Sequence, residues 1–313
     1  MTPRQQAPRL SLTVGPVLYY WPRNSLVAFY ADIADSPADT VVLGEVVCSR
    51  RHEMKPDDWL DLARDLRSAG KEVVLASQAL LESEAELRAT RRLAAQDDFL
   101  VEAGDASALR ALAGRPFVLG PHINIYSHPA LREYAQLGAV RWVAPVELSL
   151  ESLALINPPG ALAVETECFG FGRLPLAFSA RCFTARHYRL SKDECAFRCI
   201  EHPDGLLLSS TEGEPFLALN GIQSLSAAQH CLLGDGPALR AAGVTRLRLS
   251  PCAQGFGQVL DCFDRVLNRG EPLAPALETL DALALPGGLV NGYAHRRPGL
   301  EWSQRTDHAE AAL

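Results

Sequence analysis

The sequence predicts an α/β fold built around a parallel sheet, and three observations favour a barrel. Short apolar runs such as VVL at 41–43, VVLA at 73–76 and FLV at 99–101 are continuously hydrophobic, as in parallel strands buried on both faces. Six or more strand–helix units follow in series, which indicates a barrel or a doubly wound sheet. Neither G-x-G-x-x-G nor G-x-x-x-x-G-K-S/T follows the first strand, which disfavours a nucleotide-binding sheet. A chain of 313 residues suits one barrel.

The elements of the first half follow from the alternation of apolar runs with amphipathic segments. Segment 56–70 is an expected helix, with Pro56 near its start and Gly70 at its end, as helix capping preferences predict. In chain order we expect a strand at 10–18, helix 25–36, a β-rich run at 40–49, helix 56–70, strand 71–77 and helix 78–96. The same alternation continues through 99–105, 106–114, 115–120, 122–127, 129–138, 141–149, 151–158 and 162–167.

After residue 168 the sequence changes character. A cysteine-containing, arginine-rich segment at 168–204 has few β-branched runs, and it reads as an insertion whose order depends on something other than a large core. Beyond it we expect strands at 205–210 and 215–220, a helix at 223–234, a strand at 244–250 and a helix at 257–270. This C-terminal α/β part either completes the barrel or forms a small lobe. The domain is expected to span 10–300, with polar termini at 1–9 and 302–313.

Composition narrows the class of protein. A net charge of -7 argues against a nucleic-acid binder that relies on bulk electrostatics. No apolar run approaches the length of a membrane span, and the start lacks the pattern of a secretory signal. The eight cysteines are an even number, but a disulfide framework belongs to short secreted chains. We therefore expect a cytoplasmic protein whose thiols are reduced and available to metals.

Three cysteines form the most informative local pattern. Cys195 and Cys199 can face one side of a short helical turn, and Cys182 lies upstream across a basic loop. Thiolates select iron–sulfur clusters, zinc or copper(I), so a metal centre is expected. Candidates for a fourth ligand are Cys48, Cys168, Cys231, Cys252, Cys262, His187 and His202. Most of these cysteines read as small core residues. Cys48 differs because it follows a buried strand at its polar end, and its role stays open on this pattern alone.

Seven runs resemble the collagenase-like peptidase family, and within it the small members that serve oxygen-independent ubiquinone biosynthesis. They are VVLGEVVCSRR, RWVAPVELS, RLPLAFSARCFTAR, KDECAFRC, LNGIQSLS, RLRLSP and NGY, between about residue 10 and about residue 300. The resemblance implies that Cys48, Cys182, Cys195 and Cys199 hold a 4Fe–4S cluster. Arg181 and Arg198 are the cations expected to offset its negative charge. Where relatives carry a histidine in G-H-L-P-L, this chain has Arg173.

The resemblance also implies a function and partners. The chain would be an iron–sulfur subunit of an anaerobic hydroxylase that acts on the aromatic ring of a ubiquinone precursor. It would pair with a larger relative in a heterodimer, assisted by a sterol-carrier-like lipid-binding protein. Four thiolates leave no open iron site, which favours electron transfer. Two alternatives are a non-catalytic scaffold with a structural cluster, and a peptidase, although no H-E-x-x-H motif is present.

Polar residues near expected strand ends are candidates for substrate contact, because parallel α/β folds place working residues beyond the carboxyl ends of strands. The candidates are Glu45, His122, Asn124, Glu147 and Glu165, beside Ser77, Glu102, Asp105 and Glu167. The carboxylates could equally form ordinary ion pairs at the rim of a barrel.

Overall fold

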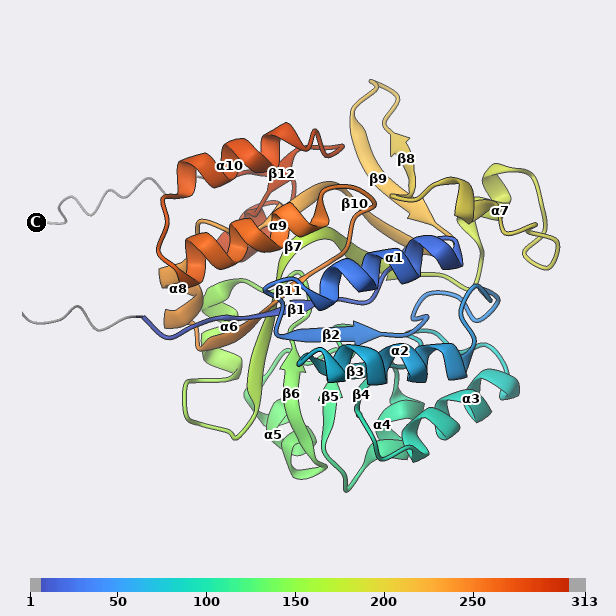
Figure 1. Ribbon diagram of the computed structural model, residues 1–313, viewed down its shortest axis with the longest axis horizontal. Helices are drawn as coiled ribbons and strands as arrows, with labels where there is room; N and C mark the ends of the chain where they lie inside the picture. Colours follow the sequence, from blue (N-terminus) through green and yellow to red (C-terminus); the bar gives the residue numbers. More distant parts are fainter. Residues whose placement is uncertain (1–6, 304–313) are drawn as a thin grey trace, which may run out of the picture.

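In the computed structural model, which describes residues 7–303, eight parallel strands close into a barrel. Strands β1 to β7 pair in chain order, and β11 pairs with both β7 and β1, which closes the ring (Figure 1). The expected α/β barrel is confirmed. The strands are β1 (Ser11–Val14), β2 (Thr40–Leu43), β3 (Glu72–Ala76), β4 (Leu100–Ala103), β5 (Phe117–Leu119), β6 (Ala139–Val143), β7 (Glu165–Phe178) and β11 (Val244–Leu249).

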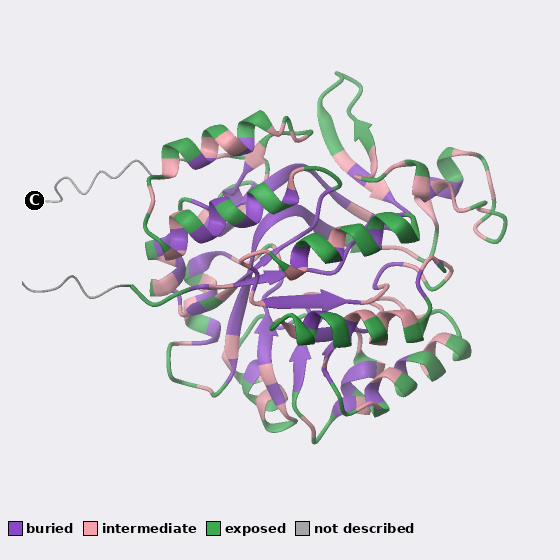
Figure 2. Ribbon diagram, in the orientation of Figure 1, coloured by how far each residue is buried: buried purple, intermediate pink, exposed green. Residues whose placement is uncertain are grey.

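Helices follow most strands and surround the barrel. Their inward faces are buried and their outward faces exposed (Figure 2), as amphipathic helices on an α/β barrel require. They are α1 (Arg23–Ala34), α2 (Pro56–Ser68), α3 (Glu84–Ala95), α4 (Ala106–Leu112), α5 (His128–Gln136), α6 (Leu150–Ile156), α7 (Phe183–His187), α8 (Gly236–Ala241), α9 (Phe256–Phe263) and α10 (Leu273–Ala282). Helix α3 starts later than expected because Ser83 and Glu86 form a capping box.

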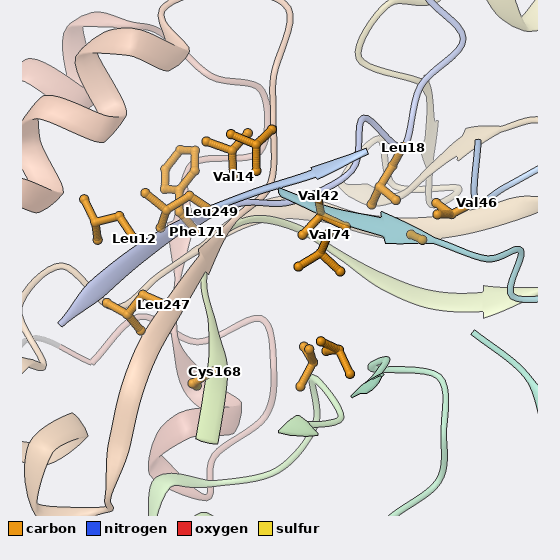
Figure 3. Packing of buried hydrophobic residues seen from close by; sticks show 14 of the residues in the cluster. Leu12, Val14, Leu18, Val42, Val46, Val74, Cys168, Phe171, Leu247 and Leu249 are labelled. Carbon is orange, nitrogen blue, oxygen red and sulfur yellow. The ribbon is translucent and has the colours of Figure 1, made fainter. Parts of the chain in front are cut away.

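The hydrophobic core is one continuous cluster of buried side chains. Leu12 and Val14 of β1 lie beside Leu247 and Leu249 of β11, and Phe171 of β7 packs among them (Figure 3). All five side chains are fully buried. Burial of this apolar surface is the main favourable term that holds the strands together.

Strand β7 continues beyond the barrel and carries an antiparallel extension. Its second half pairs with β10 (Gln223–Cys231), which pairs with β9 (Pro215–Asn220), which pairs with β8 (Leu206–Ser209). The short β12 (Leu289–Val290) joins β10 in parallel. The predicted helix at 223–234 is therefore wrong, since most of that segment is β10. Asn220-Gly221 between two strands is a hairpin signal, and it outweighs the helix-like composition that follows.

The remaining sequence expectations concern the ends of the chain. Residues 1–6 and 304–313 of the predicted polar termini lie outside the described residues. Residues 7–9 are exposed, whereas Trp302 packs against the core. Within residues 7–303, no helix is both long enough and apolar enough to cross a membrane.

Candidate metal centre

Four cysteines from separate segments line one cavity at the carboxyl-terminal end of the barrel. Cys48 lies in the loop after β2, Cys182 caps α7, Cys195 lies in the following loop, and Cys199 belongs to a 3-10 turn at Arg198–Glu201. The cavity has a volume of about 20 Å³ and opens to solvent. The other side chains that line it include Arg50, Arg51, Thr184, Lys192, Phe197 and Arg198.

Cys48 is positioned by a short loop that Glu45 organises. The Glu45 carboxylate accepts hydrogen bonds from the backbone N–H groups of Val47 at 2.9 Å and Cys48 at 3.1 Å. The N–H of Arg51 then donates to the carbonyl of Cys48 at 3.0 Å. Because these bonds fix the backbone on both sides of Cys48, its thiol is held where β2 ends.

Cys182 is positioned by the start of helix α7. Its thiol accepts a hydrogen bond from the N–H of Ala185 at 3.4 Å, as an N-capping side chain does. The helix is tied to the β9–β10 hairpin, because the N–H of Phe183 donates to the carbonyl of Gly221 at 3.1 Å and the N–H of Gly221 donates to the Thr184 hydroxyl at 2.9 Å. The β9–β10 hairpin thus supports one wall of the cavity.

A strained turn brings Cys195 and Cys199 to the cavity. Two of the three residues between them, Ala196 and Phe197, have φ of 49° and 52°, a region that non-glycine residues rarely adopt. Such outliers cluster at functional sites, where surrounding contacts hold the strain. The expected simple helical turn is therefore replaced by a left-handed pair and a 3-10 turn. Asn220 holds this turn by donating to the carbonyls of Cys199 at 3.1 Å and His202 at 2.9 Å.

Burial raises the pKa of two of these thiols, and a nearby buried cation opposes that rise. Burial raises the pKa of Cys199 to about 11, and the nearby Arg51 guanidinium opposes that rise. Burial also raises the pKa of Cys48, and Arg51 lowers it in part. The cations expected from the sequence are placed differently. Arg181 is exposed, and Arg198, although it lines the cavity, pairs with Glu201 at 2.7 Å and lies over the Tyr188 ring.

The spacing of the cysteines does not suit a single ion. Four thiolates bound to one zinc at about 2.3 Å would lie about 3.8 Å from one another. In the described part of the chain, no group of three or more His, Cys, Asp and Glu side chains lies close enough to hold one metal ion. A cluster of several irons is larger and keeps its ligands further apart, so four cysteines placed around one cavity suit it better than they suit one ion.

The other sequence candidates fall into three places. Glu45 lies beside the cysteine cavity and pairs with Arg51 at 3.4 Å. His122 lines a second cavity, at the mouth of the barrel, with Ser77, Glu102, Arg248 and Val46. Burial lowers the pKa of His122 to about 4, so its imidazole is neutral at pH 7. Asn124 and Glu147 are exposed nearby, and Glu147 accepts a hydrogen bond from Tyr126.

Glu165 lies at the opposite end of the barrel, so the prediction that it lies near the site is wrong. Strand β7 begins at Glu165 and does not end there, which makes this carboxylate part of the amino-terminal rim. It pairs there with Arg141 at 3.0 Å and Arg246 at 2.9 Å. Glu167 is fully buried one layer further in and pairs with Arg248 at 2.7 Å. Both carboxylates therefore form ion pairs within the barrel.

The loop after β2 lines both cavities. Val46 lines the cavity at the barrel mouth, and Cys48, two residues on, lines the cysteine cavity. A small molecule bound at the mouth would therefore lie next to a group held by the cysteines. In structural terms, the protein is a closed α/β barrel with a thiol-lined cavity beside its carboxyl-terminal mouth.

The chain belongs to Peptidase family U32, whose profile matches residues 25–302. This confirms the expected family, the collagenase-like peptidases. Among solved structures, the chain is similar to the U32 peptidase Mk0906, with 13% identity and a TM-score of 0.44 over 80% of this chain and 96% of that one. It is also similar to phospho-2-dehydro-3-deoxyheptonate aldolase (DAHP synthase) from Thermotoga maritima, with 11% identity and a TM-score of 0.33 over 91% of this chain and 74% of that one.

Proposed function

We propose that this chain binds a 4Fe–4S cluster through Cys48, Cys182, Cys195 and Cys199. The observation that carries the proposal is the convergence of these four cysteines on one cavity from three separate segments. The other four cysteines, at 168, 231, 252 and 262, are buried among core side chains. Four soft thiolates that share one cavity, yet form no single-ion site among the described residues, favour an iron–sulfur cluster over zinc.

The surroundings of the cavity support a charged group of this kind. Four thiolates and an iron–sulfur core carry net negative charge, which is costly to bury without compensation. Arg50, Arg51, Lys192 and Arg198 line the cavity and supply positive charge. When bound, a cluster with four cysteine ligands supplies one-electron transfer, since no iron site stays open.

We further propose that the protein is of the UbiV type and serves oxygen-independent ring hydroxylation in ubiquinone biosynthesis. The support is the set of sequence runs around the four cysteines, within a chain that belongs to Peptidase family U32. In this role it would act with a UbiU-like subunit in a heterodimer and with a UbiT-like lipid-binding protein. The cavity at the barrel mouth, next to the cysteine loop, is where the aromatic ring would bind, with neutral His122 at its wall.

The proposed role is tested by replacing Cys195 and Cys199 with serine in cells that make ubiquinone without oxygen. Loss of quinone synthesis, with a UbiU-like partner still bound to the folded variant, is the expected result. If that variant still binds its partner and supports full synthesis, the redox role is wrong and a scaffold role remains. Cleavage of a collagen or casein substrate by the purified protein would instead favour a peptidase.

A further inference from the structure

Arg51 differs from the other cations that line the cysteine cavity. Its side chain is 2% exposed, whereas those of Arg50, Lys192 and Arg198 are 32%, 25% and 40% exposed. Each of these three half-buried cations pairs with its own carboxylate, Asp193, Glu82 and Glu201 respectively, whereas the distance from Arg51 to its carboxylate, Glu45, is longer, at 3.4 Å. Water and these partners screen the exposed charges, so the charge of Arg51 acts most strongly inside the cavity.

The guanidinium of Arg51 is fixed by contacts on several sides. It donates to the side-chain oxygen of Asn220 at 2.6 Å, to the carbonyl of Asn220 at 3.2 Å and to the carbonyl of Leu18 at 3.3 Å. It also lies over the Tyr20 ring, 5.5 Å from the centroid. These contacts leave the guanidinium little freedom to swing away from the cavity.

One part of Arg51 remains without a hydrogen-bond acceptor. Its Nε is buried and has no hydrogen-bond partner among the described residues. The Arg51 side chain lines the cavity together with Cys199, and Asn220 forms hydrogen bonds with both residues. A buried donor without an acceptor costs free energy, which a negative group bound beside it would offset.

We propose that Arg51 is a positioning residue that raises the reduction potential of the cluster through Cys199. The inference rests on the proposed function, since it requires the cluster. Reduction adds one electron, and so one negative charge, to a group that is already negative. A fixed buried cation beside a ligand sulfur stabilises the reduced form more than the oxidised form. Glu45, which pairs with Arg51 at 3.4 Å, opposes this effect.

The test is a redox titration of the anaerobically purified protein with dithionite, followed by absorbance and electron paramagnetic resonance. In Arg51→Gln the midpoint potential should become more negative than in the wild type. In Arg51→Lys, which keeps the charge but loses the planar fork, the shift should be smaller. Arg64→Gln is the control, because Arg64 lies on helix α2 outside the cavity and pairs there with Asp61, so the potential should stay at the wild-type value.

A second variant covers the case in which Arg51→Gln does not fold. Glu45→Gln keeps an oxygen that can accept the two backbone hydrogen bonds but removes the negative charge, so the potential should become less negative. An unchanged potential in Arg51→Gln overturns the inference, and so does an unchanged or more negative one in Glu45→Gln. If the wild type contains no iron and sulfide, the proposed function fails and the inference fails with it. A loaded wild type with an unshifted variant removes the inference alone.

Discussion

Arg51 and Asn220 are joined by a buried hydrogen bond of 2.6 Å, although 169 positions separate them in the chain. Arg51 follows the loop that carries Cys48, and Asn220 ends strand β9 and holds the turn that carries Cys199. The bond therefore links two segments of the candidate metal centre. It also joins the barrel to its antiparallel extension.

Asn220→Ala should weaken both the fold and the centre. The substitution removes the donor to the carbonyls of Cys199 and His202 and the acceptor for Arg51. Leaving such buried groups unpaired should cost about 2–4 kcal/mol of unfolding free energy, measured by urea denaturation. Asn124→Ala is the control, because Asn124 is exposed and its replacement should cost less than about 0.5 kcal/mol. Equal losses in the two variants would contradict this role for Asn220.

Gly221→Ala should be more harmful than another glycine substitution in the same extension. Gly221 has a φ of 71°, and an added Cβ would lie 2.7 Å from the Arg51 Nη2. Gly213 has a φ of 90° with no atom within 4 Å, so Gly213→Ala measures the conformational cost alone. That cost should be about 1–2 kcal/mol, and Gly221→Ala should exceed it by at least about 1 kcal/mol. Thermal or urea unfolding of both variants compares them, and equal losses would show that the contact with Arg51 is unimportant.

Arg248→Met should destabilise the barrel strongly. Arg248 spans the interior from β11 to β4, where it pairs with Glu102 at 2.5 Å, and it also binds Glu167 on β7. Removal of the cation takes away the ion pair of buried Glu102 and leaves Glu167 with the more distant Arg141, at 3.9 Å, so we expect a loss of about 3–5 kcal/mol by urea denaturation. Arg246→Met should cost less, because its partners Glu72 and Glu165 keep Arg141. A smaller loss in Arg248→Met than in Arg246→Met would contradict this account of the interior.

Stability should fall as the pH falls below about 6.5. Burial lowers the pKa of His122 and of His230 from 6.5 to about 4. Between these values the unfolded chain binds protons that the folded chain does not, so the free energy of unfolding rises with pH and is lost on acidification. Each histidine should contribute up to about 1.4 kcal/mol per pH unit in this window. Urea denaturation from pH 5 to pH 7 should show a shallower slope in His230→Gln, and an identical slope would remove His230 from this effect.

Much of the fold could be predicted from the sequence, because buried parallel strands leave a local signature. Continuous apolar runs identify the barrel strands. The spacing of Cys182, Cys195 and Cys199 predicts a metal centre, and in the structure these three cysteines line one cavity with Cys48. The composition of 223–234 is helix-like, but Asn220-Gly221 starts a hairpin whose second strand is β10, so the predicted helix is wrong. Glu165 begins strand β7, and local composition does not show at which end of a strand a residue lies.

Arg51 could not be identified from the sequence, because its role depends on contacts with residues far away along the chain. Leu18, Asn220 and Cys199 approach it only after the barrel and its extension have formed. The sequence favours Arg181 and Arg198 as the cations that offset the charge of a cluster, because each stands next to a cysteine in the chain. The available signal is the pair of arginines two and three positions after Cys48, of which Arg51 is largely buried and Arg50 partly exposed.

Iron and acid-labile sulfide content tests the central claim most directly. Purified without oxygen, the wild-type chain should contain about four irons and four sulfides and absorb visible light as an iron–sulfur protein. Cys48→Ser should lose most of both, while Cys252→Ser, a buried cysteine outside the cavity, should keep them. A colourless wild-type protein loaded with zinc, or equal iron in the two variants, would contradict the assignment of this cavity to a 4Fe–4S cluster.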